Sequence, residues 1–231
     1  MGGETKSTAE RLNLEVIPAI LVKTKEEFIN NINKVKDYVK EIHIDVMDNK
    51  FVPNYTIKPE EIKELPNGVL YEFHWMVENQ IEWIEKTKGN HLHQIHIETI
   101  KDNWMEIIKA VKKAGGRLCL TLNPSTPVNK IEPYIKDAQR ILVMCVVPGY
   151  SHQKYIEAME DKIRYLREKY PKLEIEVDGG INFETIKRAA SAGADKFVSC
   201  SAIYSSSNIK EAIEKLKENA NEGAKIWLQK K

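Results

Sequence analysis

The sequence has no excess of charge of either sign and no long hydrophobic run. Its 231 residues include 35 basic and 34 acidic side chains, a net charge of +1. This balance creates no basic field of the kind that attracts nucleic acid, so we expect no nucleic-acid partner. No run of about 18 apolar residues occurs, which argues against a transmembrane helix and a membrane partner.

Cysteine is also scarce. Cys119, Cys145 and Cys200 are odd in number and far apart, a usage typical of reduced thiols in the cytosol and not of a disulfide framework. The N-terminus lacks the apolar segment of a secretion signal, so we expect a cytoplasmic protein. We interpret residues 1–13 as an N-terminal tail, disordered or tag-derived, and residues 14–231 as one domain.

Short apolar runs alternate with amphipathic segments along the chain. Strands are expected at 14–19, 41–46, 69–74, 92–98, 117–122, 140–146, 173–177 and 196–199. Helices are expected at 25–39, 59–65, 81–86, 104–114, 128–135, 154–169, 183–192 and 208–219, the last with Ser207 as its N-cap. Such alternation predicts a parallel sheet. Eight β/α units in about 230 residues predict an α/β protein with a single (β/α)₈ TIM barrel.

Polar side chains recur on one face of several expected strands, late in each strand. Because side chains alternate along a strand, His43 and Asp45 share a face with Met47. The same alternation places His74 with Met76, His96 with Glu98, and Glu176 with Asp178. Active sites of barrels lie at the carboxyl ends of the strands, so we expect these residues to converge there.

The converging set includes two histidines and two aspartates: His43, His74, Asp45 and Asp178. Buried together, such groups are costly unless they are paired or bound to a metal. Two nitrogen and two oxygen ligands suit Zn²⁺, Fe²⁺, Mn²⁺ or Co²⁺. A hydrogen-bonded polar cluster is the alternative, but four ligand-type residues at matching strand ends favour the metal site.

Small residues follow the last two expected strands. Gly179 and Gly180 follow the seventh, and Cys200 and Ser201 follow the eighth. In barrels these two loops commonly hold a phosphate through backbone N–H groups, and glycine allows the close approach. Ordinary turn chemistry explains the same residues equally well.

A second histidine cluster, His91, His93 and His96, invites interpretation as another metal site. Strand alternation places His91 and His93 on the face opposite to His96. We therefore expect His96 and Glu98 near the first site, and the other two histidines elsewhere.

Over about residues 14–215 the motifs resemble those of the ribulose-phosphate 3-epimerase family. The matching segments are Ile44-Asp45-Val46-Met47-Asp48, Phe51-Val52-Pro53-Asn54, His74-Trp75-Met76-Val77-Glu78-Asn79, Leu122-Asn123-Pro124, Val147-Pro148-Gly149-Tyr150, Val177-Asp178-Gly179-Gly180-Ile181 and Ser201-Ala202-Ile203. The resemblance implies an epimerase that inverts C3 of a ketose phosphate. The leading expectation is interconversion of D-ribulose 5-phosphate and D-xylulose 5-phosphate through an enediolate. It also implies one divalent metal ion per subunit and a homo-oligomer.

Carried over residue by residue, the resemblance assigns roles within this sequence. It implies metal ligands at His43, Asp45, His74 and Asp178, with Asp45 and Asp178 as the acid/base pair. It implies that Met47, Met76 and Met144 lie beside the reacting carbons. The implied substrate contacts are His74, Ser151, His152, Gln153, Lys154, Gly179, Gly180, Cys200 and Ser201.

The chain departs from the family pattern where the substrate would bind. Ala19 replaces a serine, Ser151 and His152 replace two glycines, and Cys200 replaces a glycine. Asn49 also replaces a glycine, a mild change because asparagine tolerates left-handed backbone. These changes leave two alternatives open: an epimerase of another ketose phosphate, such as allulose 6-phosphate, and a non-catalytic sugar-phosphate-binding protein.

Overall fold

The computed structural model describes residues 13–62, 65–150 and 152–229, within which eight parallel strands close into a barrel. Each strand pairs with the next along the chain, and β8 pairs with β1. This confirms the predicted (β/α)₈ TIM barrel; residues 1–12 of the predicted tail lie outside the described residues. The strands are β1 (Glu15–Ile20), β2 (Glu41–Met47), β3 (Leu70–Met76), β4 (Leu92–His96), β5 (Arg117–Leu122), β6 (Arg140–Met144), β7 (Glu174–Asp178) and β8 (Lys196–Ser199).

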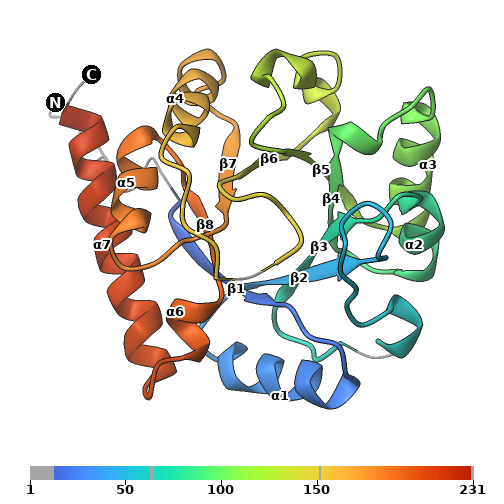
Figure 1. Cartoon of the computed structure of the whole chain (residues 1–231), viewed down its shortest axis with the longest axis horizontal. Coiled ribbons are helices and arrows are strands. Elements are labelled where there is room, and N and C mark those ends of the chain that lie inside the picture. Colours follow the sequence, from blue (N-terminus) through green and yellow to red (C-terminus); the bar gives the residue numbers. More distant parts are fainter. Residues whose placement is uncertain (1–12, 63–64, 151, 230–231) are drawn as a thin grey trace, which may run out of the picture.

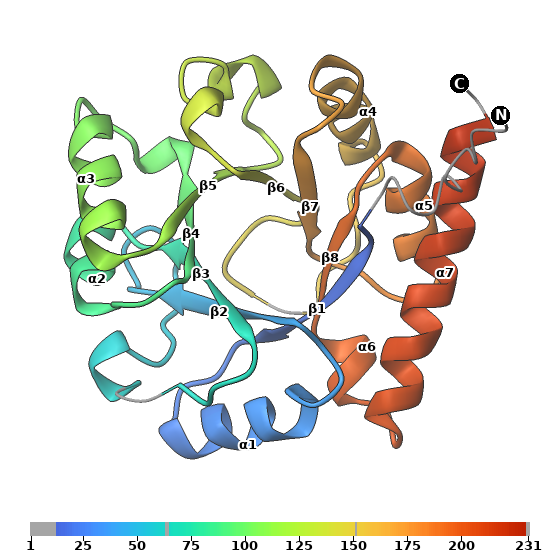
Figure 2. The ribbon, with the colours of Figure 1, turned by 180° about the vertical axis from the view of Figure 1, so that it is seen from behind.

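Helices surround the barrel on the outside (Figures 1 and 2). They are α1 (Lys25–Val35), α2 (Gln80–Lys86), α3 (Trp104–Ala114), α4 (Met159–Lys169), α5 (Thr185–Ala192), α6 (Ser201–Tyr204) and α7 (Ile209–Gln229). The start of α7 corrects one expectation. Asn208 Oδ1 accepts a hydrogen bond from the Glu211 backbone N–H at 3.2 Å, so Asn208 caps this helix and Ser207 does not. The amide oxygen of Asn208 reaches the free N–H groups of the first turn.

Two of the expected helices are 3₁₀ turns. The segment 59–65 contains η2 (Pro59–Glu61), and the segment 128–135 contains η4 (Val128–Ile131) followed by the start of η5 (Ile135–Asp137). Proline explains both differences. Pro66 disfavours helical backbone in the residue before it, and Pro133 cannot donate the hydrogen bond that an α-helix needs. The end of the expected strand 92–98 is likewise a 3₁₀ turn, η3 (Ile97–Thr99).

Alternation along the strands separates the buried side chains into two sets. Ile42, Ile44 and Val46 of β2 point outward into the main core between sheet and helices. The residues between them point into the barrel, where parallel register places them level with residues of β3. His43 pairs with Glu72, and Asp45 pairs with His74. Polar side chains are therefore stacked inside the barrel, from its floor at the amino ends of the strands to its mouth at the carboxyl ends.

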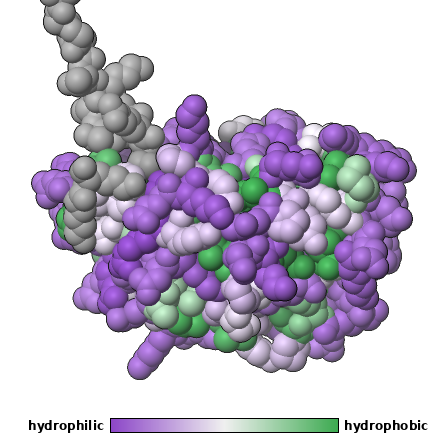
Figure 3. All heavy atoms as spheres, turned by 90° about the horizontal axis from the view of Figure 1, so that it is seen from above, coloured by the Kyte–Doolittle hydropathy of each residue, from purple (hydrophilic) through white to green (hydrophobic). Residues whose placement is uncertain are grey.

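The outer surface is mostly polar. Figure 3 shows one face, on which hydrophilic residues predominate and apolar residues are scattered. Tyr38, Met105, Tyr165 and Ile226 are exposed on separate elements, as is normal for protein surfaces, whereas Tyr55, Val147 and Tyr150 are exposed on the loops after β2 and β6. Within the described residues, no helix is long and apolar enough to cross a membrane.

Candidate active site

The carboxyl ends of β2, β3 and β7 bring four ligand-type side chains together at the mouth. One nitrogen or oxygen atom from each of His43, Asp45, His74 and Asp178 lies within 4.8 Å of all the others. Asp45 Oδ1 is 3.2 Å from His43 Nε2 and 3.0 Å from His74 Nδ1, and Asp178 Oδ2 is 3.9 Å from His74 Nδ1. The four residues expected to converge from strand alternation are thus in one cluster.

Each histidine of this cluster has a partner on its other ring nitrogen. His43 Nδ1 lies 2.7 Å from Glu72 Oε1, and His74 Nε2 lies 2.8 Å from His96 Nε2. His96 Nδ1 is in turn 3.2 Å from Glu98 Oε2. These contacts fix the ring orientations, as is usual for histidines that bind metals. His96 and Glu98 therefore lie behind His74, beside the site.

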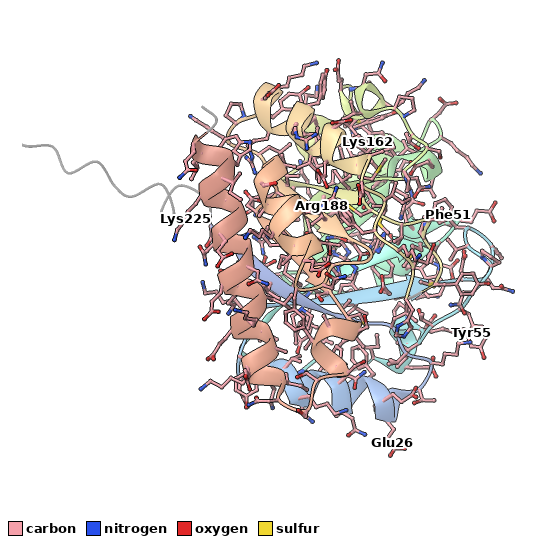
Figure 4. All side chains as sticks on the ribbon, turned by 60° about the vertical axis from the view of Figure 1, so that its left-hand side comes forward. Glu26, Phe51, Tyr55, Lys162, Arg188 and Lys225 are labelled. Atoms are coloured by element: carbon pink, nitrogen blue, oxygen red, sulfur yellow. The ribbon has the colours of Figure 1, made fainter. Side chains whose placement is uncertain are left out.

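The loop after β5 holds Glu98 in place. Glu98 Oε1 accepts hydrogen bonds from the Asn123 backbone N–H, at 2.9 Å, and from the Thr126 hydroxyl. Lys162 of α4, labelled in Figure 4, anchors this loop, since its ammonium donates to the carbonyls of Asn123, Pro124 and Thr126. The hydrogen-bond chain behind His74 therefore ends in a loop that Lys162 anchors.

The two aspartates have pKa values displaced in opposite directions. Burial raises the pKa of Asp178 to about 7, and the negative charge of Asp45 adds to this shift. Burial also favours a higher pKa for Asp45, but His43 and His74 outweigh it and hold that pKa well below its usual range. Near neutral pH the site therefore contains one ionised carboxylate and one that readily exchanges its proton.

The donor set suits a divalent cation. It offers two imidazole nitrogens and two carboxylate oxygens, the ligands that Zn²⁺, Fe²⁺, Mn²⁺ and Co²⁺ accept. Within the part of the chain that the structure describes, no lysine or arginine forms an ion pair with Asp45 or Asp178. A cation bound among these four side chains would compensate the two carboxylates.

A small cavity of about 80 Å³ lies directly above the cluster. Its walls include Asp45 and Asp178 and all three methionines expected near the reacting carbons, Met47, Met76 and Met144. The loop after β6 covers it and is tied to the loop after β2. Tyr150 donates its hydroxyl proton to the Pro53 carbonyl at 2.8 Å, and the Asn54 amide donates to the Gly149 carbonyl at 2.8 Å.

The two glycines after β7 are required by their surroundings. A Cβ on Gly179 would lie 2.4 Å from Val146 Cγ2, and one on Gly180 would lie 2.6 Å from the backbone nitrogen of Tyr155. Both also have positive φ angles, 107° and 67°. A side chain at either position would therefore clash with the Val146 side chain or the Tyr155 backbone.

Seven of the nine residues expected to contact substrate line two adjoining cavities, whereas His74 is fully buried and lines neither. Gly179 and Cys200 line the small cavity, Lys154 lines an outer cavity of about 410 Å³, and four residues line both: His152, Gln153, Gly180 and Ser201. Ser151 lies outside the described residues. Ala19 also lines the small cavity. Burial raises the pKa of the Cys200 thiol to about 12, so this group is a neutral part of the wall.

Two of the positions that replace glycine keep a left-handed backbone, whereas Cys200 has φ −111°. Asn49 has φ 58° and His152 has φ 61°, which confirms the expected left-handed tolerance at Asn49. Sequence reasoning missed Glu72 and Phe51. Glu72 could have been found because it precedes His74 by two residues and so shares its face. Phe51, labelled in Figure 4, contacts the His96 ring with centroids 4.8 Å apart, a contact that only the fold creates.

Solved structures with the same architecture are barrel enzymes. The 3-hexulose-6-phosphate synthase of Salmonella typhimurium matches with a TM-score of 0.68 and 18% identity, covering 91% of this chain and 100% of that chain. At this identity the likeness shows the fold alone. The fold and the cluster together define a (β/α)₈ barrel with its candidate site at the carboxyl ends of the strands.

The family follows from closer relatives. A family model described as the ribulose-phosphate 3 epimerase family matches residues 15–204. The cytoplasmic isoform of ribulose-phosphate 3-epimerase from Oryza sativa subsp. japonica is 39% identical over 185 residues, 77% of this chain and 81% of that protein. The Bacillus subtilis (strain 168) ribulose-phosphate 3-epimerase is 36% identical over 221 residues, 88% of this chain and 98% of that protein. The chain belongs to the ribulose-phosphate 3-epimerase family and is an isomerase.

Proposed function

We propose that this protein interconverts D-ribulose 5-phosphate and D-xylulose 5-phosphate by inverting C3. The observation that carries the proposal is the pair of aspartates, Asp45 and Asp178, at the barrel mouth beside two histidines. Their pKa values are displaced in opposite directions. Inversion requires one group that removes a proton from one face of the carbon and another that returns a proton to the opposite face.

Asp45, which is ionised at neutral pH, serves as the base for the ribulose form. Asp45 takes the C3 proton, and Asp178 supplies a proton to the other face of the enediolate. In the reverse direction the roles exchange. His43 and His74 hold Asp45 by hydrogen bonds, and the three methionines of the cavity wall exclude water from the reacting carbon.

His43, Asp45, His74 and Asp178 would hold one divalent ion, Zn²⁺, Fe²⁺, Mn²⁺ or Co²⁺. Such an ion acts as a Lewis acid and stabilises the negative charge that develops on the substrate oxygens. His74 would thereby contact substrate as well as metal. The phosphate would lie against the backbone of Gly179, Gly180, Cys200 and Ser201, with Ser151, His152, Gln153 and Lys154 on the facing loop.

A second candidate is an epimerase of another ketose phosphate, such as allulose 6-phosphate. The specific observation in its favour is that Ala19, His152 and Cys200, three departures from the family pattern, all line the small cavity. The shape of the substrate pocket is thus particular to this chain, whereas the proton-transfer pair is complete. A non-catalytic sugar-phosphate-binding protein would have no need of that pair.

We place the enzyme in the cytoplasm, as one relative's name states for that relative, and propose that it forms a homo-oligomer. Light scattering on the purified full chain tests the assembly. A monomer at micromolar concentration would refute it.

Proton NMR in D₂O tests the reaction with metal-reconstituted protein and D-ribulose 5-phosphate. The expected result is D-xylulose 5-phosphate carrying deuterium at C3, with Asp178→Asn inactive. Allulose 6-phosphate is assayed in parallel. Turnover of the hexulose alone would select the second candidate, and binding of either sugar without exchange at C3 would favour the non-catalytic protein.

A further inference from the structure

The floor of the barrel contains a buried arginine that the proposed reaction does not use. Arg140 on β6 is 1% exposed. Its guanidinium contacts four carboxylates: Glu41 at 2.8 Å, Glu72 at 2.8 Å, Glu174 at 2.9 Å and Glu176 at 3.0 Å. Stability alone does not explain such a cluster, because well-packed apolar residues often replace a buried ion cluster without loss of stability.

Two of these carboxylates, Glu72 and Glu176, lie beside Nδ1 of His43, a residue of the candidate metal site. Glu72 connects Arg140 to His43, since its Oε2 accepts from Arg140 Nη1 at 2.8 Å and its Oε1 lies 2.7 Å from His43 Nδ1. Glu72 is thus held at both oxygens. The opposite ring nitrogen of His43, Nε2, faces Asp45 Oδ1 at 3.2 Å.

Glu176 is also held at both oxygens, but it lies farther from His43 than Glu72 does. One of its oxygens accepts from Arg140 at 3.0 Å and the other accepts from the Gln94 amide at 2.8 Å. The latter oxygen also lies 3.6 Å from His43 Nδ1. Arg140 therefore contacts both glutamates that lie beside Nδ1 of His43, through one planar guanidinium group.

We propose that Arg140 is a positioning residue for the metal centre. It holds Glu72 against Nδ1 of His43, which fixes the imidazole ring so that Nε2 is directed at the metal position. This inference rests on the metal site of the proposed function. It assigns a role in metal binding to a residue on the floor of the barrel.

Metal affinity tests the proposal without reference to turnover. Co²⁺ is titrated into the full chain in competition with a chromophoric chelator, and the Co²⁺ absorption spectrum is recorded. Arg140→Leu and Glu72→Gln are each expected to weaken Co²⁺ binding by about 10- to 100-fold and to alter the spectrum. Because both act through the same contact to His43, the double variant should lose no more affinity than Glu72→Gln alone.

Glu174→Gln is the matched control. Glu174 contacts Arg140 Nε at 2.9 Å but lies on the side away from Glu72, so this variant should bind Co²⁺ within about threefold of the parent. If Arg140→Leu does not fold, Arg140→Lys replaces it in the cycle. Lysine keeps the charge but lacks the planar fork, so loss of affinity is still expected.

The outcomes separate this inference from the proposed function. Parent-like Co²⁺ affinity and spectrum in a folded Arg140 variant, or additive losses in the double variant, would overturn the positioning role while leaving the metal site intact. Failure of the parent protein to bind Co²⁺ would overturn the metal site and the positioning role together.

Discussion

The two faces of the barrel sheet bury histidine in different ways. On β4, His96 points inward and has partners at both ring nitrogens, His74 and Glu98. His93 points outward, accepts one hydrogen bond from Trp75 Nε1 at 3.1 Å, and lies parallel to the rings of Phe73 and Trp75. Its Nε2 has no hydrogen-bond partner among the described residues.

The pKa values follow this difference. Burial opposes protonation of both His43 and His93, but Asp45, Glu176 and Glu72 surround His43 and raise its pKa well above the usual range. For His93, burial lowers the pKa to about 3 and no carboxylate compensates. Buried His43 is thus compensated by carboxylates, whereas buried His93 is not and stays neutral; inward-facing His74 is intermediate, with its pKa lowered by burial to about 4.

The largest effect is expected from the inward face. Asp178→Asn should lower kcat by about 10²- to 10⁴-fold, because it removes one of the two proton-transfer groups. It should not destabilise the metal-free protein at pH 8. The raised pKa of Asp178, about 7, contributes stability that is present at low pH and is lost as the pH rises through 7, and asparagine carries no such charge.

Enzyme assays together with thermal melts check this prediction. Asp195→Asn is the matched control, because Asp195 is buried and paired with Arg167 at 2.8 Å, away from the mouth. It should retain kcat. Equal losses of kcat in both variants would show that the effect is general destabilisation.

A substitution on the outward face should lower stability and leave kcat unchanged. Leu120 on β5 is fully buried in the main core. Leu120→Ala should lower the free energy of unfolding by about 2–5 kcal/mol through lost contacts and a cavity. Urea denaturation measures this loss, and kcat well below the melting temperature should stay near the parent value. A large fall in kcat would mean that the two faces are coupled.

Metal removal should affect only the inward face. At a free ion concentration about 100 times Kd, binding adds about 2.7 kcal/mol to the stability of the folded state. This corresponds to a rise in melting temperature of roughly 5–10 °C for a chain of this size. Calorimetry with Mn²⁺, Co²⁺ or Zn²⁺, and then with a chelator, measures the shift. His74→Gln should abolish it and His91→Gln should retain it; a shift preserved in His74→Gln would argue against the proposed ligands.

Acid should act on the outward face through His93. Its folded-state pKa of about 3 lies below the unfolded value near 6.5, so the unfolded chain binds more protons between these limits. Stability from this group is complete above about pH 6.5 and is lost as the pH falls, by at most about 1.4 kcal/mol per pH unit. Urea denaturation between pH 4 and 7 measures this. The free energy of unfolding should fall less steeply with decreasing pH in His93→Gln than in the parent protein. Parallel curves for the two proteins would exclude His93 as the source.

The smallest effect is expected at the loop that covers the cavity. Tyr150→Phe removes the hydrogen bond to the Pro53 carbonyl, worth about 0.5–1.5 kcal/mol. KM for the sugar phosphate should rise by about 2- to 10-fold, with kcat little changed. Tyr165→Phe, on α4, is the control and should leave KM unaltered. A fall in kcat without a change in KM would instead place Tyr150 in the chemical step.

Strand alternation predicted much of the site, because it depends only on local geometry. His43 and Asp45 share the inward face of β2, as expected. His93 and His96 lie on opposite faces of β4, also as expected. The helix at 128–135 was wrong because Pro133 interrupts a pattern whose apolar spacing alone looked helical. Arg140 was read only as the first residue of a strand, since nothing local shows that four glutamates from β2, β3 and β7 meet it.

The sequence by itself determined the barrel, the faces of its strands and the family, since these follow from periodicity and from contiguous motifs. Only the tertiary structure decided which polar groups are partners. Asp45 and Asp178 are far apart in the chain, and closure of the barrel brings them into one buried cluster, where burial and neighbouring charge drive their pKa values apart. The reason is physical: alternation is a property of one strand, whereas electrostatic environment is a property of all the strands that surround a point.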